Sequence, residues 1–245
     1  TAVGDIREFI RHVKVPLAVR SSSLLEDALY QPFAGVYITK MLPNNQLNID
    51  DRFRSLASAI KLVYASTFFK NAKAYIETTP SMVEDEKMAV IIQEVVGKAH
   101  GNAFYPHFSG VARSYNYYPV GNSKPEDGVA NLALGLGKTI VDGGISLRYT
   151  PAYPGILPQF GNIRDIFDYS QKEFYGIDLE HRISTAFAEE DQYLIKLGID
   201  RAEHDGTLKY LASTYSGDND RVYDGIFGHG PKLITFAHIL KNEIF

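Results

Sequence analysis

The stretch VPLAVRSSSLLEDALYQPFAGVYITK, residues 15–40, holds two apolar runs separated by a polar centre. The first run ends in Arg20 and three serines, and the second begins at Gly35. We expect a β-strand that stops at Arg20, a small-residue loop, and a second strand from Gly35. The Arg20 guanidinium and the hydroxyls of Ser21 and Ser22 are donors suited to phosphate oxygens, and a glycine lets backbone approach a ligand closely. The stretch therefore predicts a phosphate-binding site.

Composition limits the classes of protein to which the chain can belong. Its 245 residues suffice for one large domain or two small ones, and its 45% apolar content provides a substantial core. The sequence has no apolar run of roughly 18 residues, so no membrane span is predicted. Cysteine is absent, which excludes disulfides and thiol chemistry and fits a reducing, cytoplasmic location. The net charge is −4 and no basic face stands out, so nucleic acid is not expected as a partner.

Hydrophobic spacing predicts the helices and strands. The clearest helical region is residues 50–76, with Asp50 or Asp51 as its cap and an apolar stripe that packs on a sheet. The stripe comprises Phe53, Leu56, Ala57, Ile60, Val63 and Tyr64. Further helices are predicted over residues 4–13, 163–175, 178–190 and 234–240. Strands are predicted over residues 35–42, 108–118, 129–134, 207–214 and 220–226. The glycines of residues 135–139, GLGKT, predict a tight turn from a strand into a helix.

Residues 87–97, KMAVIIQEVVG, predict a strand buried on both faces and interrupted by the polar pair Gln93–Glu94. Polar groups inside an apolar strand need hydrogen-bond partners. Two interpretations remain open. The pair lies at an edge with solvated side chains, or it forms a hinge whose backbone and amide hydrogen-bond a flat heterocycle such as adenine.

Several familiar motifs are incomplete. Gly137-Lys138-Thr139 match the end of a P-loop, but Leu132 stands where its first glycine is needed. Lys138 is therefore expected either near a phosphate or in solvent. The aromatic residues of 108–118 lack basic neighbours, which favours cross-strand packing over base stacking. The seven histidines show no metal-ligand spacing, so a structural or exposed role is expected for each.

Four motifs, taken together, resemble one family. AVRSSSLLEDALYQPFAG resembles the AVRSS…ED…FAG signature of the nucleotide-binding domain shared by phosphoenolpyruvate synthase, pyruvate phosphate dikinase and rifampicin phosphotransferase. AVIIQEVV, SGVARS and ALGLGKTIVDG are similar to the next three motifs of that family, in the family's order. The resemblance covers Pro16 to Gly144, and the residues after Gly144 match only by position.

The resemblance implies an α+β, ATP-grasp-like fold in which two α+β lobes hold ATP between them. Residues 1–245 would be part of the family's N-terminal nucleotide-binding domain. In that family the domain passes phosphate from ATP to a histidine on a separate swivelling domain, and a third domain converts pyruvate to phosphoenolpyruvate. The resemblance thus implies a kinase or phosphotransferase whose partners are ATP, the phosphohistidine domain and the pyruvate-binding domain of the same longer protein.

The resemblance also implies roles for individual residues. Arg20 would be catalytic and hold the transferring phosphates, Gly35 would lie on the loop that closes over them, and the hinge would hold adenine. The expected ATP-binding set is Arg20, Ser21, Ser22, Gly35, Gln93, Glu94 and Val96.

The sequence departs from the family pattern in several ways. The family's amino-terminal lysine and its Mg²⁺ ligands are expected outside this chain, so we expect a fragment that is inactive alone and contains no metal ligand. Pro32 takes the place of the usual serine, and Lys138 takes that of the usual glutamate. These two substitutions leave alternatives open. The chain could be a degenerate nucleotide-sensing or interaction domain of a regulatory protein, or part of a related dikinase that acts on an antibiotic or a glucan.

Overall fold

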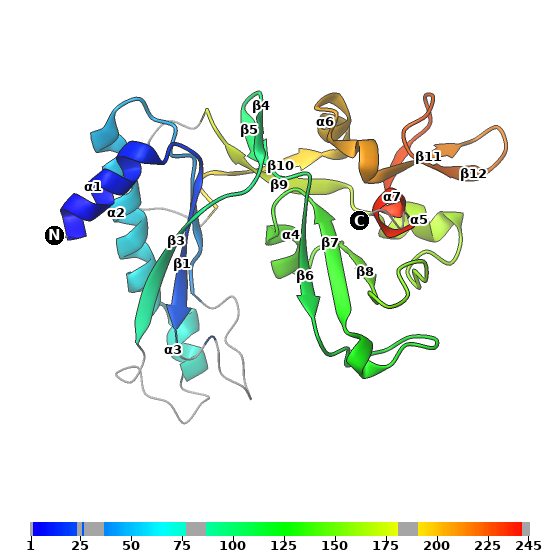
Figure 1. Ribbon diagram of the computed structural model, residues 1–245, viewed down its shortest axis with the longest axis horizontal. Coiled ribbons are helices and arrows are strands. Elements are labelled where there is room, and N and C mark those ends of the chain that lie inside the picture. The colour runs from blue at the N-terminus through cyan, green and yellow to red at the C-terminus, as the bar shows by residue number, and fades with distance from the viewer. Residues whose placement is uncertain (1, 24–25, 27–36, 77–86, 181–190, 242–245) are drawn as a thin grey trace. The chain divides into compact units, whose positions relative to one another are not determined.

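The computed structural model of the chain describes residues 2–23, 26, 37–76, 87–180 and 191–241 (Figure 1). The chain divides into two compact units. Unit 1 comprises residues 1–96, 101–104 and 177–194, and unit 2 comprises residues 97–100, 105–176 and 195–245. Among the described residues, no helix combines the length and the apolarity that crossing a bilayer requires.

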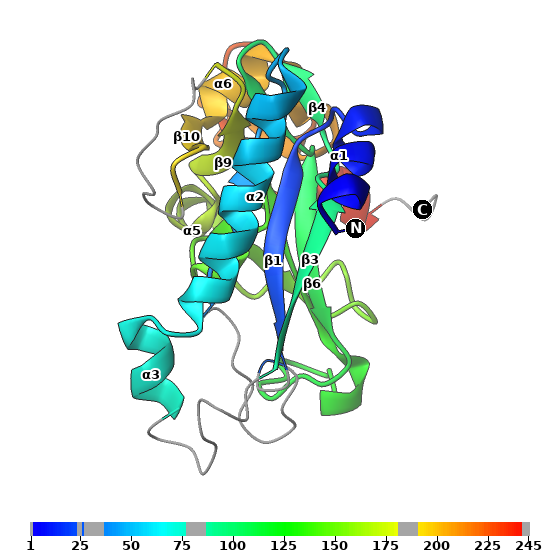
Figure 2. The ribbon, with the colours of Figure 1, turned by 90° about the vertical axis from the view of Figure 1, so that its left-hand side faces the viewer.

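Unit 1 is built on a three-stranded antiparallel sheet of order β2-β1-β3. Its strands are β1 (Leu17–Ser23), β2 (Lys40–Leu42) and β3 (Met88–Glu94). Its helices are α1 (Ala2–His12), α2 (Ile49–Ser66) and α3 (Lys70–Ile76). Helix α2 runs beside β1 and contacts all three strands of the sheet (Figure 2). The apolar core of this unit includes Ile10, Leu17, Val19, Leu56 and Val63.

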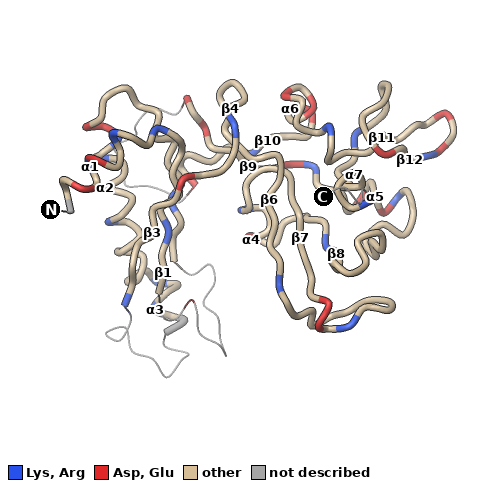
Figure 3. Tube along the Cα trace, in the orientation of Figure 1, with Lys and Arg blue, Asp and Glu red and all other residues tan. Residues whose placement is uncertain are grey.

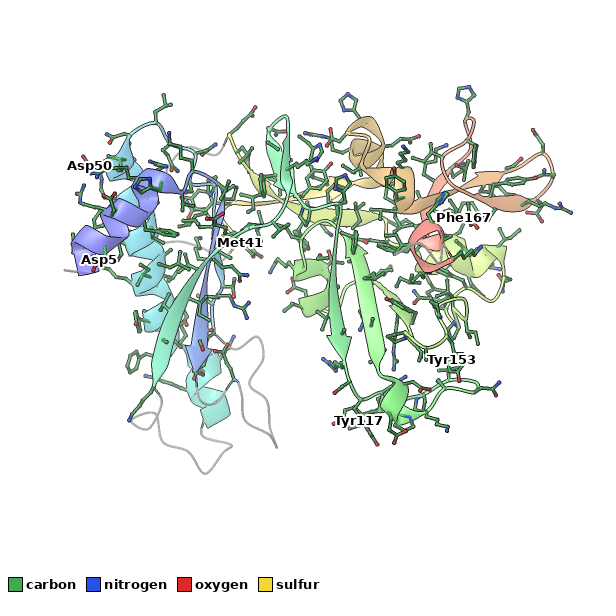
Figure 4. All side chains as sticks on the ribbon, viewed as in Figure 1. Asp5, Met41, Asp50, Tyr117, Tyr153 and Phe167 are labelled. Atoms are coloured by element: carbon green, nitrogen blue, oxygen red, sulfur yellow. The ribbon has the colours of Figure 1, made fainter. Side chains whose placement is uncertain are left out.

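The helices of unit 1 confirm the predicted regions but correct their details. The cap of α2 is Asn48, whose side-chain oxygen accepts from the Asp50 amide at 2.9 Å, and not Asp50 or Asp51. Asp50 instead pairs with Arg7 of α1 at 2.7 Å (Figure 4). The buried residues of α2 are Arg52, Leu56, Ala59, Val63 and Ser66. Leu56 and Val63 of the predicted stripe are confirmed as buried, whereas Phe53, Ala57 and Ile60 are half-buried and Tyr64 is exposed. Spacing alone does not say which edge of an apolar stripe the sheet covers.

The strands of unit 1 differ from the sequence-based expectation in two respects. Strand β1 does not stop at Arg20 but continues through the serines to Ser23. Strand β3 is not buried on both faces, because its residues alternate between half-buried and exposed. The second predicted strand begins, in the described residues, only at Lys40. Gly35 and Pro32 lie outside the described residues.

Unit 2 contains two further three-stranded sheets, of order β6-β7-β8 and β12-β11-β13. The strands are β6 (Phe108–Arg113), β7 (Val129–Leu134), β8 (Leu147–Tyr149), β11 (Ala212–Ser216), β12 (Arg221–Asp224) and β13 (Lys232–Ile234). The helices are α4 (Lys138–Val141), α5 (Ile163–Tyr169), α6 (Ile199–His204), α7 (Ala237–Lys241) and two 3-10 turns, η2 (Pro125–Asp127) and η3 (Thr207–Tyr210). The apolar core of this unit includes Tyr105, Leu134, Phe174, Leu208 and Leu233.

A four-stranded sheet of order β10-β9-β5-β4 takes residues from both units. Its strands are β4 (Lys98–His100), β5 (Ala103–Tyr105), β9 (Glu173–Asp178) and β10 (Leu194–Gly198). Residues 173–175 and Asp178 of β9 were predicted as helix. The buried Gln171 explains the break, because its amide bonds both the amide and the carbonyl of Leu134, at 2.7 and 3.1 Å, and so ends α5 before β9 begins. Of the helix predicted over 178–190, Asp178 is strand and residues 181–190 lie outside the described residues.

Other predictions in unit 2 are confirmed or shortened. Strand β7 and the turn into α4 are confirmed. The strand predicted over 108–118 ends at Arg113. Residues 207–210 form the turn η3 rather than strand, because Gly206 adopts φ 72° and the Thr207 hydroxyl donates back to the Ala202 carbonyl at 3.1 Å. The final predicted helix begins three residues late, at Ala237, because Ile234 closes β13.

Candidate functional site

The pairing of β1 with β3 brings predicted site residues to one face of the unit 1 sheet. Directly opposite residues of an antiparallel pair share a face. Ala18 lies opposite Gln93, Arg20 opposite Ile91, and Ser22 opposite Ala89. We call the surface formed by these side chains the open face; its residues are Arg20, Ser22, Ala89, Ile91 and Gln93. Ala18 lies on the same side but is buried, opposite Met41 of β2 (Figure 4).

The other face of the same sheet is covered by α2. Leu17 and Val19 are fully buried, and Ser21 and Ser23 are nearly so. The hydroxyl of Thr67, which follows α2, contacts the Met88 sulfur at 3.6 Å on this side. The contrast in burial between alternate residues therefore distinguishes a packed face from an open one.

Arg20 is exposed on the open face. Within the part of the chain that the structure describes, its guanidinium has no carboxylate or hydrogen-bond partner. Its neighbour Ile91 is 43% exposed, which adds an apolar surface beside the charge. A planar guanidinium beside an apolar surface suits a ligand that combines phosphate oxygens with a flat apolar group.

The serines after Arg20 do not act as one set. Ser22 is half-buried on the open face, whereas Ser21 lies on the covered face and donates to Glu26 Oε1 at 2.8 Å. The Glu26 amide donates in turn to Ser23 Oγ at 3.3 Å. In the sequence Glu26 stands out only as a motif position. No sequence pattern indicates that it bonds the serines at the polar end of β1.

The end of β3 offers backbone groups on a free edge. Val95 donates to the Pro16 carbonyl at 2.9 Å, so every second residue of β3 bonds to β1. By this alternation the amide and carbonyl of Glu94 point away from β1. In the described sheet β3 is a terminal strand. Gln93 is therefore an exposed edge residue, as in the first interpretation, and the hinge that would bond a heterocycle through Glu94 stays a prediction.

Val96 lies just beyond β3, with an exposed fraction of 81%. Unit 1 ends at Val96 and unit 2 begins at Gly97 in this part of the chain. The structure thus brings Arg20, Ser22 and Gln93 together on one face and sets Glu94 and Val96 at the end of that sheet. It separates Ser21 from them, and Gly35 lies outside the described residues.

The glycine turn after β7 is held by close contacts. Gly135 adopts φ 79°, and a Cβ there would lie 2.6 Å from Phe174 and 2.8 Å from the Tyr175 carbonyl, so only glycine fits. Lys138 Nζ lies 3.1 Å from Asp142 in the next turn of α4, and its side chain is only 18% exposed. Lys138 is therefore half-buried beside a carboxylate rather than in open solvent, and the alternative of a place near a phosphate stays a prediction. The carboxylate compensates part of the charge that the substitution introduces.

The described residues offer no ready metal site. They contain no group of three or more His, Asp or Glu side chains that could hold a metal ion. The expectation that Mg²⁺ ligands lie elsewhere stays a prediction.

Comparisons with known proteins agree with this geometry. No curated protein matches the chain. A sequence model of the family described as the AMP/ATP-binding domain of pyruvate phosphate dikinase matches residues 2–157, which is more than half of the chain and includes all four motifs. The chain therefore belongs to the family of the AMP/ATP-binding domain of pyruvate phosphate dikinase, a nucleotide-binding domain of α+β, ATP-grasp-like fold.

Proposed function

We propose that this chain is part of the ATP-binding domain of a phosphoenolpyruvate synthase-like phosphotransferase. The domain would pass phosphate from ATP to a histidine on a separate domain of the same longer protein, for the conversion of pyruvate to phosphoenolpyruvate. The observation that carries the proposal is the guanidinium of Arg20, which has no partner among the described residues and shares the open face of unit 1 with Ile91 and Gln93.

The direction of the strands suggests how ATP would lie. Glu94 pairs with Leu17, which precedes Arg20 by three residues, or roughly 10 Å along a strand. A base bonded to the free edge at Glu94 and Val96 would direct its phosphates along β1. They would reach Arg20 and then Ser22. Gln93 and Ile91 would lie beneath the sugar and the base.

Each residue would have a defined task in this proposal. Arg20 would bind the transferring phosphate and stabilise the charge that develops on it, because positioning and electrostatics supply most of the catalysis in phosphoryl transfer. Ser21, through Glu26, would hold the end of β1 rather than touch ATP. Gly35 would lie on the loop that closes over the phosphates. Mg²⁺ would neutralise phosphate charge, and we assign none of the described residues to it.

The test uses the intact parent protein with ATP, magnesium and pyruvate. Phosphohistidine and phosphoenolpyruvate are followed in the parent, in Arg20→Gln and in Arg54→Gln. Arg54 is a matched control because it is an exposed arginine of α2 that pairs with Asp51. We expect Arg20→Gln to lower phosphohistidine formation by about 10³-fold, in the range of arginines that stabilise phosphoryl transfer. Arg54→Gln should leave it unchanged.

The outcomes distinguish the alternatives. A well-folded parent that forms no phosphohistidine would contradict the proposal, and ATP binding without any turnover would favour a nucleotide-sensing domain. Phosphohistidine without phosphoenolpyruvate would retain the ATP site and change the final acceptor, for example to an antibiotic or a glucan.

A further inference from the structure

A concave site lies within unit 2, and none of its lining residues belongs to the open face. It is a pocket of about 300 Å³ formed by four parts of the chain: residues 116–123, Val129 of β7, the strand β8 with Thr150, and residues 153–159. Gln159 holds residues 153–159 against β8, because its side chain accepts from the Arg148 amide at 2.8 Å and donates to the Ser146 carbonyl at 3.2 Å. The pocket is therefore a bounded site rather than a gap between free loops.

The cation of the pocket is Arg148. One nitrogen of its guanidinium, Nη2, donates to Asn116 Oδ1 at 2.7 Å and to the Tyr118 carbonyl at 3.3 Å. Asn116 is only 2% exposed, and its backbone N–H donates to the Pro125 carbonyl at 2.8 Å. Arg148 is thus oriented by an anchored neutral group. Within the described chain, its Nε and Nη1 donors are not engaged, so part of the fork remains for a ligand.

No acidic side chain compensates this charge in the pocket. The lining residues contain one arginine and no aspartate or glutamate. In the described part of the chain Arg148 forms no ion pair. A guanidinium whose partners are neutral carbonyl oxygens keeps its full positive charge. The pocket therefore favours an anion, and a single cation matches a single negative charge.

The walls of the pocket are largely aromatic and aliphatic. Tyr118, Tyr149 and Tyr153 line it together with Ile156. Of these residues, Figure 4 labels Tyr153. Tyr153 is 40% exposed and Ile156 49% exposed, so both retain apolar surface that a ligand could cover. Ligand sites typically combine such walls with a few oriented polar groups, and about 300 Å³ is at the small end of their range.

We propose that this pocket binds a small monocarboxylate with a flat, apolar body. The carboxylate accepts two hydrogen bonds from the free side of Arg148, and the body packs against Tyr153 and Ile156. A phosphate dianion is disfavoured because the lining supplies only one cation. This site shares no residue with the proposed ATP site, so either assignment can fail without the other.

The test measures binding of benzoate to the whole 245-residue chain by NMR titration, with benzamide, acetate and phenyl phosphate as probes. For a ligand this small we expect a Kd of about 1 mM for benzoate. Benzamide and acetate should each bind at least about tenfold more weakly, because one lacks the charge and the other the flat body. Equal binding of benzamide, or tighter binding of phenyl phosphate, would overturn the carboxylate assignment without any variant.

Variants locate the site. Arg148→Gln should weaken benzoate binding by about tenfold or more, and Arg148→Lys should restore only part of it, because lysine has no planar fork. Tyr153→Ala should also weaken binding. The matched control is Arg221→Gln, an exposed arginine of β12 in the same unit that does not line the pocket. Unchanged benzoate binding in Arg148→Gln, or no binding by the wild-type chain up to about 10 mM, would overturn the proposal.

Discussion

Two sheets of this molecule have the same size and pairing but different central strands. In unit 1 the central strand β1 is LAVRSSS, apolar in its first half and polar in its second. In unit 2 the central strand β7 is VANLAL, in which every residue except Asn131 is buried. Figure 3 shows the same contrast in charge, because β1 carries a basic residue and β7 carries no charged residue.

The same topology therefore forms a packed central strand in one sheet and leaves a charged side chain exposed in the other. Both sheets are antiparallel and three-stranded. Strand β7 uses its side chains for packing, and its functional contribution is the turn that Gly135 allows at its end. Strand β1 uses alternate residues for packing and leaves Arg20 on a face that no described helix of unit 1 covers.

The turn after β7 should tolerate no side chain. Gly135→Ala adds both a left-handed strain and a Cβ within 3 Å of Phe174 and the Tyr175 carbonyl, so we expect it to lower the free energy of unfolding by about 4 kcal/mol. Gly143→Ala is the control, because Gly143 has a similar φ of 72° but nothing within 4 Å of the added Cβ; it should cost about 1 kcal/mol. Urea denaturation measures both, and equal losses would refute the steric argument.

Shortening a side chain should lower the free energy of unfolding more in the packed strand β7 than on the open face. Leu134 of β7 is fully buried, so Leu134→Ala should cost about 3 kcal/mol of unfolding free energy. Ile91 is 43% exposed on the open face, so Ile91→Ala should cost below about 1 kcal/mol. Denaturation midpoints of the two variants test this. A large loss in Ile91→Ala would mean that the open face is packed in solution.

Acid should weaken unit 2 in two stages. Burial lowers the pKa of His100 below 6.5. Burial alone would raise the pKa of Asp205, but hydrogen bonds from Tyr105 (2.6 Å), His204 and Arg201 outweigh it and bring that pKa below 3.8. In both cases the unfolded chain binds protons before the folded chain does. Stability should therefore be complete above pH 6.5, begin to fall below it, and fall further below pH 3.8.

The two acid stages can be measured by urea denaturation over a pH series. Tyr105→Phe removes one hydrogen bond to Asp205 and should reduce the loss below pH 3.8 while leaving the loss below pH 6.5. A stability that rises as the pH falls through 6.5 would contradict the direction assigned to His100.

Of these residues, Arg20 is expected to affect stability least and function most. Arg20 has no partner among the described residues, so Arg20→Gln should change the unfolding free energy by less than about 0.5 kcal/mol. ATP binding by the parent protein should nevertheless fall. A destabilisation of several kcal/mol would instead assign Arg20 a structural role. Melting temperature and nucleotide titration on the same sample separate the two results.

The amino-acid sequence is enough to identify the family and the most regular helix and strand. The motifs around Arg20 and Gln93 give the nucleotide-binding family, because phosphate and base binding need particular residue types at fixed spacing. The helical period of residues 50–76 and the apolar run of β7 indicate their elements, because the spacing of apolar side chains differs between a helix and a strand.

Only the tertiary structure shows which face of a strand is packed and which is open. Alternation along β1 separates Arg20 from Ser21, but only the position of α2 makes one side packed and the other open. It also decided contacts between residues far apart in sequence, such as Gln171 with Leu134 and Arg148 with Asn116. Such pairs leave no periodic signal in the chain, because hydrogen bonds between separate elements depend on how those elements pack and not on local spacing.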